Sequence, residues 1–530
     1  MIKYNFALLV IALGASLFLI SPIDAVPVSS GLSDPDKQPK FTTIAPNPLD
    51  PSFKYDTSYG VIQISIGEGT SDTGLVGPDG ITPLSTKIWG YGTRGTHTWP
   101  GKTFEVQSGV TLMVNWRNGI PIENGYLLTG KDNGSFGNFS RRSVVDTSYH
   151  WAFSLPGYQN YSIEENGTPI VPHLHGGHND AAFDGNPEYF FTPQFGVRGP
   201  QWHTEIYKYD NSQPASALWY HDHALGITRL NVYAGMAGFY FVRDEQDTGK
   251  QDNPMNLPAF PYELAFAIQD RMFKDTGELF YPAFPGDPFY SDFITDEGAD
   301  INDDDPTALA EFFGDHMVVN GKIWPKVDVE PRHYRLRLLN GCDSRFLVME
   351  LFAVDANQTD FVDAEPISFH VIGGDQGLAT ESKAAEKIVI HPSARFDIIV
   401  DFTGLNGKRV IMKNSGGDEP FGGTIPGIQA YEHTDKVLAF DVSLPINTTI
   451  PDNYNVDFSA VSKSIENIKV DKVRRVGLFE GRDQFGRLQP LLGTIDPGAY
   501  ISNILSFANV YYGKEKLTRS FLRLQIKPLI

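Results

Sequence analysis

Apolar and polar residues alternate along much of the chain, which predicts short, half-buried strands. In GVTLMVNWRN, at 109–118, Val110, Leu112, Val114 and Trp116 occupy every second position. Side chains two residues apart in a strand point to the same face, so this segment would bury one apolar face. The later segments LAFAIQDRMF, HYRLRLLNG and FDIIVDFTG are further β-rich runs. We therefore expect an all-β protein.

Helical patterns are scarce. The best candidate for a short helix is PTALAEFFGDHM, at 306–317, whereas RLNVYAGMAGFYFVRD, at 229–244, resembles a β-rich run that closes a domain near residue 245. The 51 Gly and 36 Pro are spread through the chain as turn punctuation, as expected for many short strands.

A chain of 530 residues is longer than the chains that usually fold around a single hydrophobic core. We therefore expect several β-sandwich domains in series. The predicted division is a signal peptide (1–25), an arm or linker rich in Pro, Ser and Asp (26–55), and three domains (56–245, 246–445 and 446–530).

The N-terminus has the pattern of a secretory signal peptide. Lys3 precedes an apolar run over 6–20, and Pro22 and Ala25 lie in a cleavage-like region. We therefore expect a secreted mature protein with no membrane segment. Six N-x-S/T sequons predict a glycoprotein: Asn133, Asn138, Asn160, Asn166, Asn357 and Asn447.

The charge balance limits the partners. A net charge of −21 and a pI near 5.0 oppose binding to nucleic acid or anionic membranes, because phosphate binding requires a positive surface. With one cysteine, Cys342, the chain forms no internal disulfide.

Two H-x-H pairs carry the candidate chemistry. His173 and His175 occur in HLHGG, and His221 and His223 in WYHDH. In a strand, each pair would present two imidazoles on one face. Neutral imidazole suits copper, zinc, iron and nickel, so four converging histidines indicate a transition metal without choosing it.

The segments around these pairs add a resemblance to a known family. PHLHGG, LWYHDHALGITRLNVYAGMAGFY, VVNGKIWPKVDVEPRHYRLRLLN, IGGDQGL and HPSARFDIIVDF resemble, in this order, the multicopper oxidases of the three-cupredoxin laccase type, in particular spore-coat laccases and bilirubin oxidases. The resemblance covers roughly residues 60 to 497. It implies tandem cupredoxin-like Greek-key β-sandwich domains, copper as cofactor, and O₂ and a small reducing substrate as partners.

The resemblance also implies site residues. His173 would bind the type 2 copper, and His175, His221 and His223 the type 3 pair. Asp184, in FDGNPE, matches an acid that relays protons to reduced oxygen, although a loop carboxylate without function is an equal alternative. Asp222 lies between two ligands and should point to the opposite face, as a supporting residue rather than a ligand.

This sequence departs from the family pattern in its C-terminal part. It has no His after His433, no Met after Met412 and no Cys after Cys342, so the type 1 copper site and four cluster histidines of the family have no counterpart here. Cys342 lies in LLNGCDSRF without a neighbouring histidine, and we interpret it as a small buried apolar residue. From about residue 498 the family pattern ends, and we expect an incomplete third sandwich and fewer than four coppers.

The leading hypothesis is an oxidoreductase that oxidises phenols, aminophenols, bilirubin-like tetrapyrroles or metal ions and reduces O₂ to water. One alternative is a zinc hydrolase or cupin-type dioxygenase, which also uses H-x-H. The other is a catalytically inactive, secreted copper-binding or structural protein derived from such an oxidase.

Overall fold

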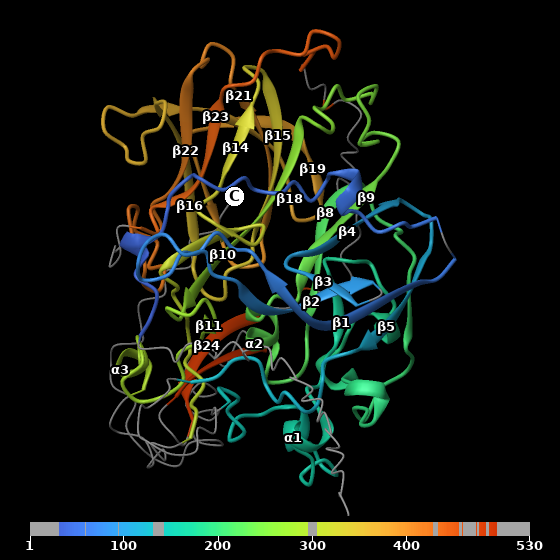
Figure 1. Cartoon of the computed structure of the whole chain (residues 1–530). Helices are drawn as coiled ribbons and strands as arrows, with labels where there is room; N and C mark the ends of the chain where they lie inside the picture. Colours follow the sequence, from blue (N-terminus) through green and yellow to red (C-terminus); the bar gives the residue numbers. More distant parts are fainter. Residues whose placement is uncertain are drawn as a thin grey trace, which may run out of the picture.

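The computed structural model describes residues 31–494, except for 59, 94, 131–142, 295–304, 428–432, 455–457, 459–472, 474–475 and 484–486. The expected signal peptide, the sequence after residue 498 and the sequons Asn133 and Asn138 lie outside the described residues. Strands dominate, which confirms the all-β prediction (Figure 1). The α-helices of the described part are short, with four to six residues each: Ile163–Asn166 (α1), Thr228–Tyr233 (α2) and Tyr290–Phe293 (α3).

The first sandwich consists of a five-stranded sheet, in the order β3-β2-β1-β5-β7, and a four-stranded sheet, in the order β4-β9-β8-β6. Its first half contains Ile62–Ser71 (β1), Thr86–Thr93 (β2), Thr96–Thr98 (β3), Gly101–Gln107 (β4) and Leu112–Asn118 (β5). Its second half contains Pro172–His175 (β6), Ile206–Tyr209 (β7), Ser216–Asp222 (β8) and Ala237–Arg243 (β9).

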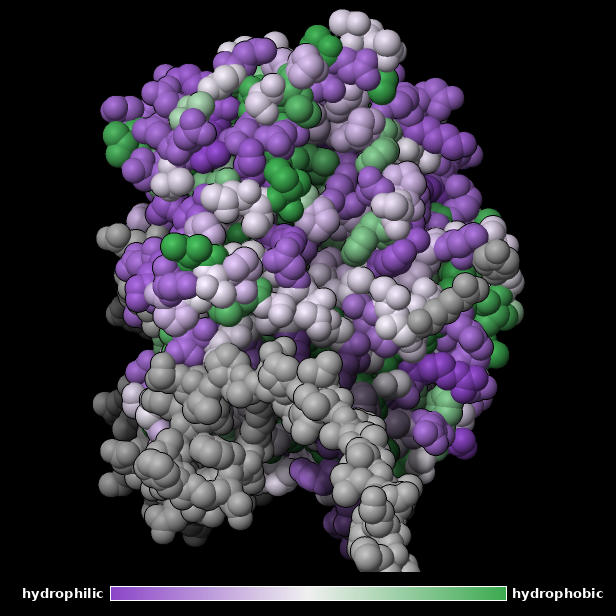
Figure 2. Space-filling model, viewed as in Figure 1, coloured by the Kyte–Doolittle hydropathy of each residue, from purple (hydrophilic) through white to green (hydrophobic). Residues whose placement is uncertain are grey.

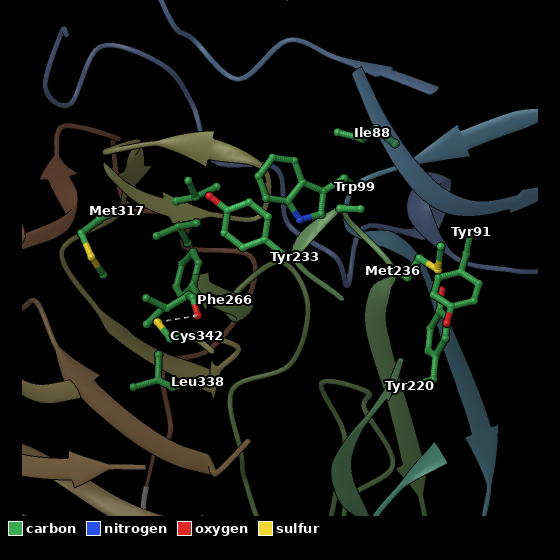
Figure 3. Close-up of a cluster of buried hydrophobic side chains, with 14 of the residues drawn as sticks. Ile88, Tyr91, Trp99, Tyr220, Tyr233, Met236, Phe266, Met317, Leu338 and Cys342 are labelled. Carbon is green, nitrogen blue, oxygen red and sulfur yellow. Dashed lines mark hydrogen bonds between the residues drawn. The ribbon is translucent and has the colours of Figure 1, made fainter. Parts of the chain in front are cut away.

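Aromatic side chains from both sheets form the core of this sandwich. The ring of Tyr91 on β2 lies 4.8 Å from that of Tyr220 on β8, and Phe104 on β4 lies 5.1 Å from Tyr220. Figure 3 shows Tyr91 and Tyr220 beside Met236. Trp116 of the predicted alternating strand is buried among these rings, whereas Val110 precedes β5 and is exposed. Edge-to-face aromatic pairs of this kind stabilise the core beyond the contribution of the apolar area they bury.

The second sandwich combines an eight-stranded sheet with a six-stranded sheet. The three β-rich runs expected from the sequence become neighbouring strands, in the order β10-β15-β21. The eight strands are Glu263–Phe273 (β10), Leu279–Phe280 (β11), His316–Val319 (β12), Lys322–Ile323 (β13), His333–Asn340 (β15), Phe369–Gly374 (β18), Gly377–Ala385 (β19) and Arg395–Asp401 (β21). The six are Lys326–Val329 (β14), Leu347–Asp355 (β16), Glu365–Ile367 (β17), Lys387–Ile390 (β20), Lys408–Asn414 (β22) and Lys436–Val442 (β23).

A buried ion network joins the two sandwiches. Arg243, at the end of β9, pairs with Glu263 on β10 at 2.8 Å, and Arg335 on β15 pairs with Asp247 at 2.7 Å and Asp397 at 2.6 Å. The side chains in these pairs are at most 6% exposed. The connection from Arg243 to Glu263 spans the predicted boundary near residue 245, and the domain division itself stays a prediction.

The N-terminal arm packs on the second sandwich. Phe41 is buried, and its backbone N–H donates to the Trp324 carbonyl at 2.7 Å. Ser33 hydrogen bonds through its hydroxyl to Nε2 of His316 at 3.2 Å, and Asp315 accepts from Nδ1 of that ring at 2.6 Å. This scattered histidine is therefore a satisfied core residue.

Two secondary-structure expectations are wrong. Residues 306–315 form no helix, because several of their backbone N–H groups donate to distant side chains and that of Thr307 donates to the Ala283 carbonyl, instead of to carbonyls four residues earlier. Phe312 donates to the Ser344 hydroxyl and Gly314 to the Asp270 carboxylate. In the run at 229–244, the first residues belong to helix α2, and only its second half forms a strand, β9.

The described residues after 446 include one hairpin, Val476–Arg482 (β24) paired with Leu488–Thr494 (β25). Arg487, which precedes β25, ion-pairs with Asp146 and donates to the Ser148 hydroxyl at 3.1 Å.

Hydrophilic residues cover most of the described surface on the face shown in Figure 2, with hydrophobic residues in small groups. Among the described residues, no helix has both the length and the apolar character needed to cross a bilayer.

Candidate metal centre

The two H-x-H pairs lie on adjacent antiparallel strands. β6 is the edge strand of its sheet and pairs with β8, so that His173 lies opposite His221 and His175 opposite Trp219. On β6, both histidines are partly exposed and Leu174 between them is buried in the core, as strand alternation requires. His223 follows β8, and its backbone N–H extends the pairing to the Val171 carbonyl at 2.8 Å.

The four imidazoles converge. The ring centre of His173 lies 5.7 Å from that of His175, 5.2 Å from that of His221 and 4.8 Å from that of His223. Potential ligand nitrogens of His173, His175 and His221 all lie within 4.8 Å of one another. The expected convergence at one edge of the first sandwich is thus observed.

Hydrogen bonds determine which ring nitrogens keep a lone pair. Nδ1 of His221 contacts the Asp222 carbonyl at 2.6 Å, and Nδ1 of His173 contacts the Asp184 carbonyl. A carbonyl only accepts, so each Nδ1 must donate and each Nε2 keeps its lone pair. Nδ1 of His175 lies 3.2 Å from Nε2 of His221, and Nδ1 of His223 is buried without a hydrogen-bond partner. The His175–His221 contact is a hydrogen bond in the tautomer that protonates Nδ1 of His175, and it leaves two lone pairs close together in the other tautomer.

Burial favours the neutral form of His175, His221 and His223 by lowering the pKa of each ring. It lowers the pKa of His175 to about 4, with a further contribution from the positive charge of Arg395. It likewise lowers the pKa of His223 to about 4, aided by His173, and holds the pKa of His221 well below its ordinary value. Neutral imidazole is the form that binds metals.

Trp219 is a site residue that we did not single out from the sequence. Its ring stacks on His221 at 4.1 Å and on His175 at 5.2 Å, both with an interplanar angle of 29°. The sequence spacing could have predicted this position, because residues 219, 221 and 223 share one face of a strand. Trp219 fixes the planes of two candidate ligands.

The second sandwich also contacts the site. Arg395 on β21 donates from Nε to the Ala217 carbonyl at 3.0 Å, and Gln376 donates to the Gly176 carbonyl at 3.3 Å. Gly176 has φ of +87°, and a Cβ there would lie 2.8 Å from Nη2 of Arg395. The HGG turn therefore requires glycine at this position. No pattern in the sequence linked residue 395 to residue 176.

The two acidic residues differ in placement. Asp184 lies at the rim, with its side chain 48% exposed and its Oδ1 3.9 Å from Nδ1 of His173. Asp222 is 1% exposed, and its carboxylate accepts hydrogen bonds from backbone N–H groups, which agrees with the expectation that it is not a ligand.

Cys342 lies in the core of the second sandwich. Figure 3 shows it beside Phe266 and Leu338, and its Sγ donates to the Ile268 carbonyl at 3.8 Å. Burial raises the pKa of its thiol well above the ordinary value, so the thiolate that binds metals is disfavoured. This supports its interpretation as a small core residue.

A transition metal fits the chemistry of this donor set. The site offers four converging imidazoles, three of which have potential ligand nitrogens within 4.8 Å of one another, and its nearest carboxylates are at the rim or turned away. Imidazole-only sites suit copper, zinc, iron and nickel. Hydrogen bonds from Nδ1 to carbonyls, as in His173 and His221, are the usual support for ligating histidines.

Comparisons with known proteins identify relatives of the chain. The chain is 31% identical over 402 residues to a laccase of Bacillus subtilis (strain 168), a match that covers 76% of this chain and 66% of that protein. It is 29% identical over 362 residues to multicopper oxidase LPR1 of Arabidopsis thaliana, covering 68% of this chain and 52% of the plant protein.

The fold agrees with these matches. The McoA multicopper oxidase from Aquifex aeolicus superposes with a TM-score of 0.55 at 19% identity, covering 86% of this chain and 74% of that structure. No protein-family model matches the chain. The chain spans about two thirds of the length of the bacterial laccase and about half of the plant oxidase. On the strength of the matches to bacterial laccases and plant oxidases, the chain belongs to the multicopper oxidase family.

Proposed function

We propose that His173, His175, His221 and His223 bind copper and that the protein is an oxidase of the laccase type. The observation that carries this proposal is the approach of Nδ1 of His175 to Nε2 of His221 at 3.2 Å. Nε2 of His221 keeps its lone pair, and Nδ1 of His175 offers a second one in the tautomer that carries its proton on Nε2, so one cation can bind both nitrogens at this distance. When bound, copper supplies the one-electron chemistry by which the family reduces O₂ to water.

The individual roles follow the family pattern. His173 would hold a type 2 copper through Nε2, since its Nδ1 is engaged by the Asp184 carbonyl. His175, His221 and His223 would hold type 3 copper. Trp219 stacks on His175 and His221 and thereby fixes the planes of their rings. Because burial lowers the pKa of His175 to about 4, protons do not compete with copper for this ring near neutral pH.

Asp184 is the proposed proton relay. Its carboxylate is half exposed, lies near His173 and accepts a hydrogen bond from Asn179 at 3.3 Å. A carboxylate in this position exchanges protons with solvent on one side and faces the site on the other. The alternative, a loop carboxylate without function, predicts full activity for an Asp184→Asn variant.

The proposed electron donors are small molecules: phenols, aminophenols, bilirubin-like tetrapyrroles or metal ions. The printed sequence contains four histidines in H-x-H pairs and one cysteine, Cys342, which is buried in the second sandwich. We therefore propose fewer than four coppers in this chain and no type 1 copper. The rival function is a copper-binding protein without turnover.

The N-terminal pattern and the sequons support secretion as a glycoprotein. Asn160 and Asn357 are exposed in the structure, as glycosylation requires. Mass spectrometry of protein from the culture medium tests this, since an unmodified protein retained in the cells would contradict it.

Copper binding and turnover are tested together on the full chain. We expect copper to bind to the wild type and to a His391→Ala control, an exposed histidine, and to be lost in His175→Ala. Uptake of O₂ with a phenol or Fe(II) then separates the oxidase from the copper-binding rival. Equal copper binding in wild type and His175→Ala would exclude this cluster as the site.

A further inference from the structure

The carboxylate of Asp222 lies behind the histidines, on the opposite face of β8. Its Oδ1 accepts from the backbone N–H of Val171 at 2.8 Å. Its Oδ2 accepts from the backbone N–H of Ala224 at 3.0 Å and from Nδ2 of Asn231 at 2.8 Å. With the residue 1% exposed, these three donors satisfy a carboxylate that has lost its water.

The positions of these donors link the two histidine pairs. Val171 stands two residues before His173, and Ala224 directly follows His223. One side chain therefore connects the backbone that leads into the first H-x-H pair with the backbone that leaves the second. It does so at the end of the β6–β8 pairing, where Pro172 lies opposite Asp222.

A second layer of contacts holds the carboxylate in place. Asn231, on helix α2, also donates from Nδ2 to the Pro169 carbonyl at 3.2 Å. Its Oδ1 accepts from the Tyr126 hydroxyl at 2.7 Å. Asn231 is fully buried and Tyr126 is 6% exposed. The network thus fastens α2 and the Tyr126 segment to the backbone beside the histidines.

We propose that Asp222 is a positioning residue that sets the spacing of the two H-x-H pairs, and thereby the metal affinity of the site. The proposal rests on metal binding by the four histidines. If Asp222 no longer accepted from Val171 and Ala224, two buried N–H groups would lack a partner. The position of the end of edge strand β6 relative to His223 would then no longer be fixed. Both carboxylate oxygens are occupied by these donors, so Asp222 is not itself a ligand.

Asp222→Asn tests this role because it keeps the size of the side chain but places an NH₂ group against an N–H donor. We expect Cu(II) affinity to fall about 10- to 100-fold, the range seen when supporting residues of metal sites are changed. The Cu(II) electron paramagnetic resonance spectrum should also change. Tyr126→Phe keeps the carboxylate and its three donors, and should give a smaller loss in the same direction.

The matched control is Asp287→Asn. Asp287 is also a buried carboxylate that accepts from two backbone N–H groups, those of Ala283 and Phe284, at 2.9 Å each. Cu(II) affinity and spectrum of this variant should equal those of the wild type.

The outcomes are separable. If the wild type binds Cu(II) and Asp222→Asn behaves like Asp287→Asn, the positioning role is wrong and the proposed metal site stands. If the wild type binds no Cu(II), the proposed function fails and this role fails with it. If Asp222→Asn does not fold, Tyr126→Phe decides: a weakened affinity with an altered spectrum supports the role, and an unchanged one overturns it.

Discussion

Nδ1 of His175 lies 3.2 Å from Nε2 of His221, although 46 positions separate the two residues in the sequence. The antiparallel pairing of β6 and β8 creates this approach, because it places His173 opposite His221 and His175 opposite Trp219. The strand register, rather than any single loop, therefore defines the candidate metal centre.

Removal of one of these two rings should abolish tight copper binding. His221→Ala deletes a candidate ligand that is 5% exposed and leaves the nitrogen of His175 without its counterpart. We expect copper affinity to fall at least a hundredfold, measured by competition with a chelator. His97→Ala is the control, since His97 hydrogen bonds to Ser65 and Glu68 away from the cluster and its loss should leave copper affinity unchanged.

Trp219→Ala should weaken both the fold and the site. The indole is 4% exposed and stacks on two histidines. Its removal leaves a cavity, which should lower the unfolding free energy by about 3 to 5 kcal/mol. Trp219→Phe keeps an aromatic face and should lose much less. Urea denaturation measures both, with Leu478→Ala as the control, because Leu478 is 84% exposed. Equal stability of all three variants would show that the stack contributes nothing.

The ion network between the sandwiches predicts loss of stability in acid. Burial opposes ionisation of Glu263, but the charges of Arg243 and Arg335 outweigh it and lower the pKa to about 2; the pKa of Asp247 is lowered in the same way. Carboxyl groups with a lowered folded-state pKa stabilise the fold above their unfolded pKa, about 4, and lose that contribution as the pH falls toward 2.

Urea denaturation between pH 7 and pH 3 should therefore show a falling unfolding free energy below about pH 4.5. In Asp247→Asn this pH dependence should be shallower, and stability at pH 7 should drop by about 3 to 5 kcal/mol because Arg335 loses a buried partner. Asp355→Asn, an exposed carboxylate, is the control. The same slope in Asp247→Asn and wild type would contradict this role of the network.

Much of the fold was predictable because strand periodicity is local. The alternation around Trp116 gave β5, and the two H-x-H pairs each present both rings on one face, as spacing alone predicts. Proximity of the two pairs to each other was expected only through the family resemblance. Periodicity does not tell which strands become neighbours.

The failures of prediction have tertiary causes. Phe312 has the apolar spacing of a helix, yet its ring stacks on Tyr281 at 5.1 Å and its N–H donates to Ser344, so packing overrides the local preference. Arg395 reaches the histidine site from the second sandwich, 178 residues from its acceptor at Ala217. Contacts between distant segments leave no short-range pattern in the sequence.

The copper-loaded chain should lack the intense blue absorption of a type 1 site. That absorption requires a cysteine thiolate in a site with two histidines. Cys342 donates to the Ile268 carbonyl, and burial raises its pKa, so it remains a thiol. A visible spectrum of the loaded chain checks this, with Cys342→Ser expected to leave it unchanged. A blue protein whose colour vanished in Cys342→Ser would show that this thiol binds copper.

The central claim is that the four converging histidines bind copper. The most direct measurement is the copper content of the full chain after copper loading and removal of excess metal, compared with that of the double variant His175→Ala/His221→Ala. We predict that the wild type retains copper at fewer than four ions per chain and that the folded double variant retains none. No retained copper in the wild type, or the same amount in the double variant, would contradict the claim.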